Sequence, residues 1–525
     1  MRGPDRQAAS GRARPAGGPL YAPRWVRIAY QAFFLLLFLA VLLAMTDEGV
    51  RRLPVRWLFH LDPLTALGMA LSSWTLTPGL LWALAIVGLT VAFGRAFCGW
   101  ICPVGTMHQI VSRATRRLRP GPPAQVNRWR PHFRLKYLLL IALGIAALAG
   151  TMLAGLFDPI SLAARSLGSS LFAALAAVLP GEGFRPRVFQ AAWVTGAIFL
   201  ALLAANRWIV RWWCRAICPL GALLGWIARV AVYRIDVDPD LCTRCNRCAA
   251  DCQGADEPFS KHRVSECHVC LNCVAACPEG AIAFRPFVPS ALPSGGVDLQ
   301  RRQVVGAALA GAALLPLARA SSGSASSPGP LAIRPPGACA EEEFLARCVR
   351  CGACVHACPT SALQPAVGEA GPEGVYTPVL VPRRGWCEPS CTLCGRVCPT
   401  GAIRPLTPEE KGWTRPEAEG IRIGTAFFDL GRCLPWGPAI PCIVCQEVCP
   451  TSPKAIWLEP VEVPGRDGRP VRLQRPHMDP ARCVGCGLCE AKCPVSDLAA
   501  VRVTRVGESR ARQSSLTLPP RRTGS

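Results

Sequence analysis

The sequence contains 29 cysteines, and their spacing is the clearest chemical signal in the chain. All but five of them fall into six runs, most of which read Cys-x2-Cys-x2-Cys-x3-Cys. Thiols two residues apart do not readily pair as disulfides, but they wrap well around a metal cluster. The spacing therefore predicts iron–sulfur clusters of the [4Fe–4S] type. Zinc is the alternative for any single run, and a disulfide-rich secreted protein is disfavoured.

Two of the runs lie close together, and each ends in a cysteine that could serve the other. They consist of Cys242, Cys245, Cys248 and Cys252, and of Cys267, Cys270, Cys273 and Cys277. In two-cluster ferredoxins the fourth cysteine of each run ligates the other cluster. We therefore expect Cys277 to join the first three cysteines of the first run, and Cys252 to join the first three of the second.

Four further runs lie between residues 348 and 493. They are Cys348, Cys351, Cys354 and Cys358; Cys387, Cys391, Cys394 and Cys398; Cys433, Cys442, Cys445 and Cys449; and Cys483, Cys486, Cys489 and Cys493. The first gap is longer than two residues in the second and third of these runs. Four runs imply four clusters, about six in the whole chain. The spacing does not say which runs exchange their fourth cysteine. Short strand-like pieces at 402–403, 455–457 and 501–503 fit a small ferredoxin fold.

Two further cysteine pairs follow apolar segments in similar nine-residue motifs. Cys98 and Cys102 belong to Phe97–Gly105, and Cys214 and Cys218 belong to Trp213–Gly221. The similarity indicates an internal duplication. These four thiols could ligate one more cluster, act as a dithiol relay, or simply pack. Cys339 is left over and is interpreted as a free buried thiol.

Apolar segments place much of the chain at a membrane. The uncharged stretches are Ile28–Thr46, Pro63–Gly94, Tyr137–Phe157 and Val188–Asn206, and a spanning helix needs about 20 apolar residues. The net charge is +24, and arginines crowd the head, the loop from Cys98 to Arg134 and the segment after Asn206. An excess of Lys and Arg marks the cytoplasmic side, so these segments should face the cytoplasm. This reading is preferred to nucleic-acid binding.

A fifth apolar stretch runs from Gln303 to Ala318 directly after Arg301-Arg302. It resembles a twin-arginine export signal inside the chain, and the alternative is a short interdomain helix. Counting it as a span would place the C-terminal cysteine runs in the periplasm of a multi-pass protein of the bacterial inner membrane.

The expected fold class is an α-helical membrane domain of four spans, plus a possible fifth, with α+β ferredoxin-like domains. The expected domains are a disordered basic head (1–27), a membrane domain (28–230), a cytoplasmic two-cluster ferredoxin (231–290), a signal or anchor with linker (298–330), a four-cluster domain (331–507) and a disordered tail (508–525). No haem-attachment motif or dinucleotide fingerprint is present, so neither haem nor flavin is expected. His60 and His108 lie near span ends and could touch a quinone, but are read as solvated residues.

These motifs carry a family resemblance. Residues 22–290 resemble the NapH or MauN membrane iron–sulfur proteins. Residues 298–505 resemble the NapG or MauM ferredoxin-type proteins, through the paired arginines, Arg334–Gly337 before Glu343–Leu345, and the four runs. The resemblance implies a fused quinol dehydrogenase that passes electrons from the quinone pool to a periplasmic reductase, such as nitrate reductase, or to a cytochrome. The alternatives are an electron-supplying maturation factor for a methylamine dehydrogenase or copper enzyme, and a purely structural scaffold.

Overall fold

The computed structural model describes residues 24–45, 56–119, 121–178, 188–259, 262–286, 299–320, 332–413, 420–464 and 470–510. Most of the basic head, the linker after residue 320 and nearly all of the C-terminal tail lie outside these residues. The chain divides into two compact units. Unit 1 comprises Met1–Leu36, Ala85–Tyr137 and Leu202–Gln300, and unit 2 comprises Leu37–Leu84, Leu138–Ala201 and Arg301–Ser525.

Two helical stretches among the described residues are long and apolar enough to cross a membrane, Arg24–Leu43 (α1) and Pro123–Leu148, which ends in α9 (Leu135–Leu148). Shorter apolar helical stretches occupy Pro78–Phe93, Ala192–Arg207 and Pro219–Val230. The third predicted span was placed too far along the chain. Its helix stops at Leu148, and Gly150 has a left-handed φ of +89°.

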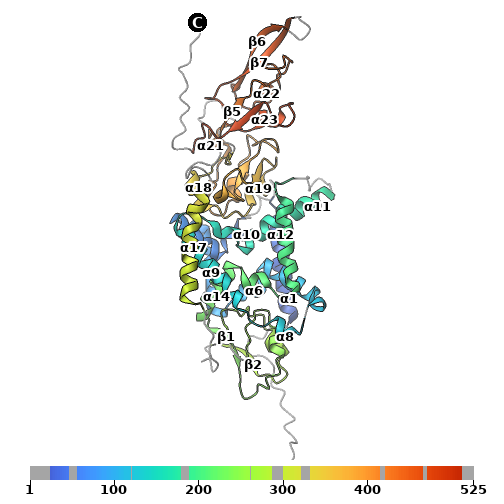
Figure 1. The fold of residues 1–525 in the computed structure, drawn as a ribbon, viewed down its shortest axis with the longest axis vertical. Coiled ribbons are helices and arrows are strands. Elements are labelled where there is room, and N and C mark those ends of the chain that lie inside the picture. Colours follow the sequence, from blue (N-terminus) through green and yellow to red (C-terminus); the bar gives the residue numbers. More distant parts are fainter. Residues whose placement is uncertain are drawn as a thin grey trace, which may run out of the picture. The chain divides into compact units, whose positions relative to one another are not determined.

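The second predicted span is divided into α4 (Pro63–Ser73), a 3₁₀ turn and α5 (Ala83–Phe93). The fourth contributes α12 (Ala192–Ala204), and the signal-like stretch forms α17 (Arg301–Ala320) (Figure 1). The four-span domain therefore stays a prediction.

Four helices begin at a proline that follows an Asp or Cys, and they form two similar pairs. They are α4 after Asp62, α10 (Pro159–Ser166) after Asp158, α7 (Pro103–Ala114) after Cys102 and α14 (Pro219–Ile227) after Cys218. Proline is preorganised for the first helical position, and the Asp side chains accept hydrogen bonds from backbone N–H groups of the first turn. The repeated starts agree with an internal duplication.

Unit 1 contains a small α+β fold around the first two cysteine runs. Strands β1 (Tyr233–Val237) and β2 (Ile282–Pro286) pair antiparallel, with Tyr233 opposite Pro286. Helices α15 (Arg247–Ala250) and α16 (Asn272–Ala276) lie between them in sequence.

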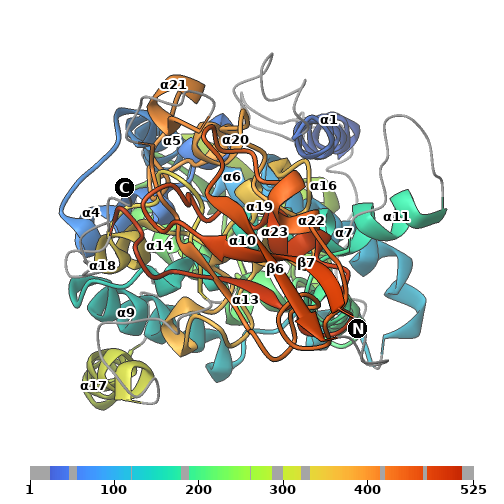
Figure 2. The ribbon, with the colours of Figure 1, turned by 90° about the horizontal axis from the view of Figure 1, so that it is seen from above.

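Unit 2 contains two further copies of a small α+β fold; in the first copy the helices flank the strand pair in sequence, and in the second the strands flank the helices as in unit 1. The first copy pairs β3 (Leu363–Pro365) with β4 (Pro378–Leu380) and contains α19 (Ala353–Ala357) and α20 (Leu393–Val397). The second copy pairs β5 (Thr425–Phe428) with β8 (Val501–Thr504) and contains α22 (Val444–Glu447) and α23 (Leu488–Lys492). A long hairpin of β6 (Ile456–Pro464) and β7 (Pro470–Met478) extends beside α22 (Figures 1 and 2). The predicted strand pieces are confirmed in β6 and β8, and Ile403 forms an isolated bridge to Ala338.

Candidate iron–sulfur sites

The cysteine runs share an unusual backbone conformation. In the four runs that begin Cys-x2-Cys-x2-Cys, the residues on either side of the second cysteine have positive φ angles. These residues are Arg244 and Asn246, Val269 and Leu271, Arg350 and Gly352, and Gly485 and Gly487. Alternating left-handed residues turn successive N–H groups into one concavity that binds anions. Strained conformations such as the one at Val269 (φ 49°) are concentrated at functional sites, so this loop fits a sulfide-containing cluster.

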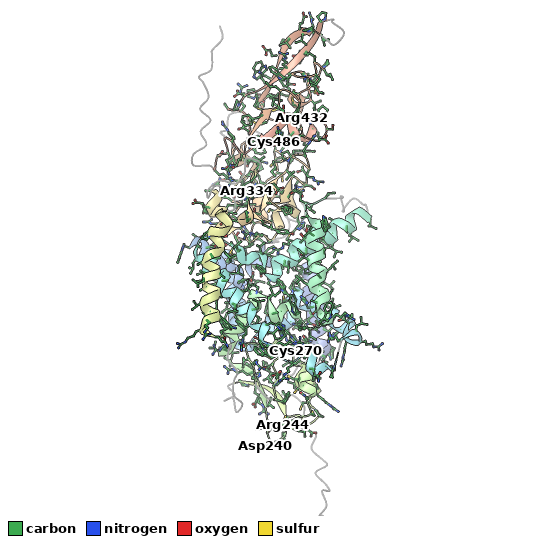
Figure 3. The ribbon with its side chains drawn as sticks, in the orientation of Figure 1. Asp240, Arg244, Cys270, Arg334, Arg432 and Cys486 are labelled. Carbon is green, nitrogen blue, oxygen red and sulfur yellow. The ribbon has the colours of Figure 1, made fainter. Side chains whose placement is uncertain are left out.

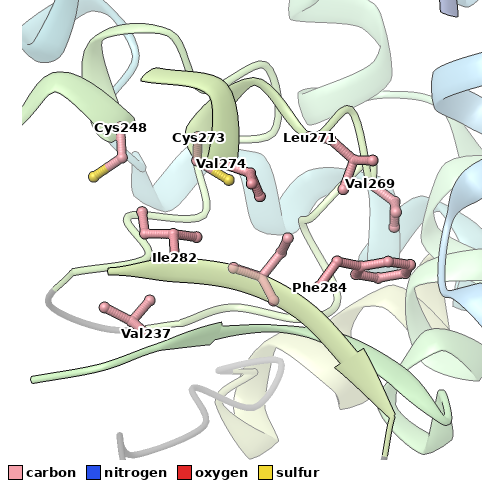
Figure 4. Close-up of a cluster of buried hydrophobic side chains, with 9 residues drawn as sticks. Val237, Cys248, Val269, Leu271, Cys273, Val274, Ile282 and Phe284 are labelled. Atoms are coloured by element: carbon pink, nitrogen blue, oxygen red, sulfur yellow. The ribbon is translucent and has the colours of Figure 1, made fainter. Parts of the chain in front are cut away.

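The first two runs lie against one apolar core, and Cys252 of the first run lies among the thiols of the second. The core contains Val237, Val269, Val274, Ile282 and Phe284, and Cys248 and Cys273 reach it from α15 and α16 (Figure 4). Figure 3 shows Cys270 nearer to the helical part of unit 1 than Arg244, which lies in the first run.

Electrostatic neighbours identify two groups of thiols in unit 1. The pKa of Cys248 is raised to about 11, chiefly by burial and also by Cys242 and Cys245. The pKa of Cys252 is likewise raised to about 11, by burial and then by Asp256 and Cys270. We call Cys242, Cys245 and Cys248 set A, and Cys252, Cys267, Cys270 and Cys273 set B. Cys277 packs against the same core, and its place in set A stays a prediction.

The four later runs exchange cysteines in sequence order. One cavity is lined by Cys348, Cys351, Cys354 and Cys398, which form set C. The pKa of Cys394 is raised well above its usual value by burial and then by its neighbours Cys387, Cys391 and Cys358, and these four form set D. A second cavity is lined by Cys449, Cys483, Cys486 and Cys489, which form set E. The neighbours of Cys433 and Cys445 define set F as Cys433, Cys442, Cys445 and Cys493.

Sets C to F follow one another without a gap. Cys394 of set D is among the neighbours that raise the pKa of Cys354 of set C. The backbone N–H of Cys387 in set D donates to the carbonyl oxygen of Cys486 in set E at 2.8 Å. Cys489 of set E has Cys445 of set F as a neighbour. The order within unit 2 is therefore C, D, E, F.

Within the described residues, no three His, Cys, Asp or Glu side chains are close enough to share one metal ion. A preformed mononuclear zinc site is not visible there. The thiols of sets C and E instead line a common cavity each, and a cluster of several irons would separate them. The donor chemistry and the left-handed loops thus fit [4Fe–4S] clusters.

The two Cys-x3-Cys-Pro motifs come together in unit 1. Cys98, Cys102, Cys214 and Cys218, the four-thiol group, are mutual electrostatic neighbours. Burial raises the pKa of Cys102, Cys214 and Cys218. Cys102 and Cys218 occupy the N-cap positions of α7 and α14, where the helix dipole favours negative charge, and the Cys218 sulfur accepts from the Gly221 N–H.

Buried cations surround the four-thiol group. Arg95, Arg211, Arg215 and Lys136 have no exposed surface, and Arg211 donates to the Cys98 carbonyl oxygen at 3.0 Å. Glu266 pairs with Lys136 and lies 3.8 Å from Arg95. Buried charge is costly unless it is compensated. An anionic cluster held by thiolates would supply the missing negative charge.

The structure also shows the surroundings of the two histidines and of the single left-over cysteine that the sequence singled out. His60 and His108 are buried, so their interpretation as solvated residues is wrong. His60 approaches the Pro399 carbonyl oxygen at 3.2 Å, and His108 bonds Asn206 at 2.6 Å. Cys339 is only partly buried, and its thiol donates weakly to the Gly401 carbonyl oxygen at 3.5 Å.

Three family models match the chain. A 4Fe–4S binding domain matches residues 75–122 and 189–236, which contain the two Cys-x3-Cys-Pro motifs. A 4Fe–4S dicluster domain matches residues 347–402, and another 4Fe–4S binding domain matches residues 476–496. No solved structure matches.

Curated relatives agree with these matches. The methylamine utilization ferredoxin-type protein MauM of Methylorubrum extorquens is 39% identical over 34% of this chain and 76% of its own length. MauM of Paracoccus denitrificans is 38% identical over 33% of this chain and 70% of its own length. The regulatory protein NosR of Pseudomonas aeruginosa is 31% identical over 37% of this chain and 25% of its own length.

The thiol sets and these matches define an iron–sulfur protein of electron transport that binds [4Fe–4S] clusters. Through about a third of its length, the chain belongs to the family of MauM ferredoxin-type proteins.

Proposed function

We propose that the chain is a multi-pass protein of the bacterial inner membrane that holds six clusters and carries electrons from quinol to a periplasmic acceptor. Sets A to F, with Cys277 completing set A, supply the cluster ligands. The observation that carries the proposal is the contact between Cys387 and Cys486, which makes four cluster sites continuous. A purely structural use of clusters would not need this continuity.

The direction of electron flow follows from what set C touches. Arg350, between two of its cysteines, donates to the Met152 carbonyl oxygen in the segment after α9. Ser72 at the end of α4 donates to the Ala346 carbonyl oxygen. Set C thus adjoins residues of two predicted spans, whereas set F lies at the other end of the series. Electrons would enter at set C and leave from set F.

The chain's division into units supports the proposed topology. It changes from one unit to the other at residues 36, 84, 137 and 201, inside the four predicted spans, and again at residue 300. The arginine-rich segments group with sets A and B, and the alternate segments group with sets C to F. This supports a cytoplasmic location for the first ferredoxin and a periplasmic one for the second.

The four-thiol group is proposed to hold a seventh cluster. The four-thiol group lies close to set B in the chain's packing, because Gly99 packs against the backbone of His268, which lies between Cys267 and Cys270. A cluster held by these four thiols would be the entry point for electrons on the cytoplasmic side of the membrane, as set C would be on the periplasmic side. The matched 4Fe–4S binding domain supports a cluster in preference to a dithiol relay.

Two functional proposals differ in the protein that accepts the electrons. The NapG-like resemblance favours a nitrate reductase-like enzyme or a cytochrome. The membership in the MauM family favours a role in methylamine utilization, as an electron supplier during enzyme maturation. Steady reduction of the clusters by quinol is expected for the first role only.

The relay is tested on the anaerobically purified full chain with a soluble menaquinol analogue. Cys394→Ser removes the set D cluster, so set F should no longer be reduced by quinol but should still be reduced by dithionite. Cys445→Ser removes the set F cluster and should leave quinol reduction of sets C to E unchanged. The proposal fails if wild-type clusters are not reduced by quinol, or if set F is still reduced at the normal rate in Cys394→Ser.

A further inference from the structure

A cationic cavity lies in unit 1, next to the start of α1 and the end of α7. Its volume is about 120 Å³, which is room for several water molecules or for a group such as a phosphate. Five arginines line it: Arg24, Arg113, Arg116, Arg119 and Arg211. Asp251 is the acidic residue in the lining, and it pairs with Arg24. The cavity therefore carries an excess of positive charge.

Several buried polar atoms in the lining have no hydrogen-bond partner among the described residues. They are Nε of Arg211, which is fully buried, Oε1 of Gln253 (8% exposed) and Oδ1 of Asn272 (5% exposed). Buried polar groups are normally satisfied, and leaving one unpaired costs free energy. A bound ligand that accepts from guanidinium groups and also donates hydroxyl hydrogens would satisfy all three atoms.

Ordinary interfacial arginines explain only part of this arrangement. Arg113 and Arg116 are exposed and could be solvated, but Arg211 is enclosed and its neighbours in the cavity wall are also buried. Guanidinium groups that converge on one space are the usual means of binding phosphate. A carboxylate ligand would leave more of the donors unused.

The cavity lies at the start of an apolar helix, and this position favours the phosphate of a lipid head group over free phosphate. Arg24 is the first residue of α1, whose apolar body follows immediately. Basic pockets beside membrane helices on the cytoplasmic side bind the head groups of anionic lipids. The glycerol hydroxyls of such a head group would also reach the unpaired amide oxygens.

We infer that this cavity binds the phosphate group of an anionic phospholipid with a hydroxylated head group. The site lies beside Cys252 of set B, which also lines the cavity. The inference rests on the proposed membrane location. It adds a lipid site that the electron relay by itself does not require.

The test titrates the detergent-solubilised full chain with short-chain phosphatidylglycerol, short-chain phosphatidylcholine and inorganic phosphate. Saturable binding of phosphatidylglycerol is expected, with far weaker binding of the other two. Arg113→Gln together with Arg116→Gln should weaken the binding of phosphatidylglycerol about thirtyfold, because each basic residue near an anionic lipid surface contributes about fivefold to the affinity. Arg117→Gln together with Arg130→Gln removes two nearby exposed arginines that do not line the cavity, and should change the affinity less than twofold.

Equal binding of the two lipids would overturn the inference, and so would binding of inorganic phosphate without a preference for phosphatidylglycerol. Equal effects of the two double variants would show solvated arginines instead of a site. Iron content and quinol-driven reduction, measured on the same preparations, separate failure of the lipid site from failure of the relay.

Discussion

Gly155 lies directly against the backbone carbonyl of Val349, so a Cβ atom at position 155 would collide with that oxygen. Val349 stands between Cys348 and the left-handed Arg350 in the loop of set C. The absence of a side chain at Gly155 therefore lets this cysteine loop seat on the segment after α9. The packing of this loop against the segment after α9 and the binding of a cluster by set C should therefore depend on each other.

Gly155→Ala should destabilise the C-terminal part of unit 2 by about 1–3 kcal/mol, because added atoms meet backbone that cannot rotate away. The measurement is the temperature at which the visible absorbance of the clusters is lost. Gly144→Ala is the matched control, since a Cβ at that position of α9 meets nothing within 4 Å. If both variants lose their clusters at the same temperature, the contact does not matter.

Iron content can test the exchange of cysteines in unit 2. Cys348→Ser and Cys398→Ser should each lose one cluster of about four irons, and the double variant should lose no more, because both residues belong to set C. Cys358→Ser combined with Cys398→Ser should lose about eight, since these residues serve sets D and C. Cys339→Ser is the control and should lose none. Equal losses in the two double variants would mean that each run binds its own cluster.

Arg334 should be essential for the fold of the C-terminal domain (Figure 3). Its buried guanidinium bonds Glu341 at 2.6 Å, Thr377 at 2.7 Å and the Pro378 carbonyl oxygen at 2.9 Å. Arg334→Met leaves Glu341 with Arg510, at 2.8 Å, as a remaining cation, but it leaves the buried Thr377 hydroxyl and Pro378 carbonyl without this donor, which costs about 1–3 kcal/mol. The loss of stability would be measured as a lower temperature of thermal unfolding of the purified variant.

The comparison for Arg334 is Arg347→Met, which breaks the half-exposed Glu343–Arg347 pair one helical turn apart. Such surface pairs contribute about 0.3–0.5 kcal/mol. Unfolding of Arg334→Met at the temperature of Arg347→Met would show that the buried pair contributes no more than an exposed one.

Much of the candidate site was visible in the sequence, since cysteine spacing is local and the backbone needs no distant residue to form each loop. Glycines at 352, 485 and 487 and Asn246 also mark left-handed positions that sequence reasoning passed over. The order of sets C to F was not readable, because the contact between Cys387 and Cys486 joins residues far apart in the chain.

The apolar helices were predicted by composition but not by length. An uncharged stretch shows that a segment tolerates lipid, but it does not show where the helix stops. Helix α4 ends at Ser73, and the φ of 53° at the following Trp74 depends on surrounding structure. The burial of His60 was hidden for the same reason, since its partner carbonyl belongs to Pro399, beyond α17 and the linker.

Asp62 and Asp158 provide a prediction about pH. Both are buried helix caps, and the pKa of Asp158 is raised well above its usual value of 3.8, first by burial and then by the charge of Asp62. At pH values above 3.8 the unfolded chain releases a proton that the folded protein keeps. Stability from this group therefore falls as pH rises, until the folded pKa is passed.

Asp158→Asn removes this dependence while keeping an equally good helix cap, because an Asn oxygen can still accept from the N–H of Ser161. The variant should unfold at a higher temperature than the wild type at pH 7, and the difference should shrink as the pH is lowered toward 5. Asp240→Asn, on an exposed residue of unit 1, should leave the pH profile unchanged. A lower unfolding temperature for Asp158→Asn at pH 7 would mean that the ionised carboxylate is required, and that Asp158 is charged in the folded protein.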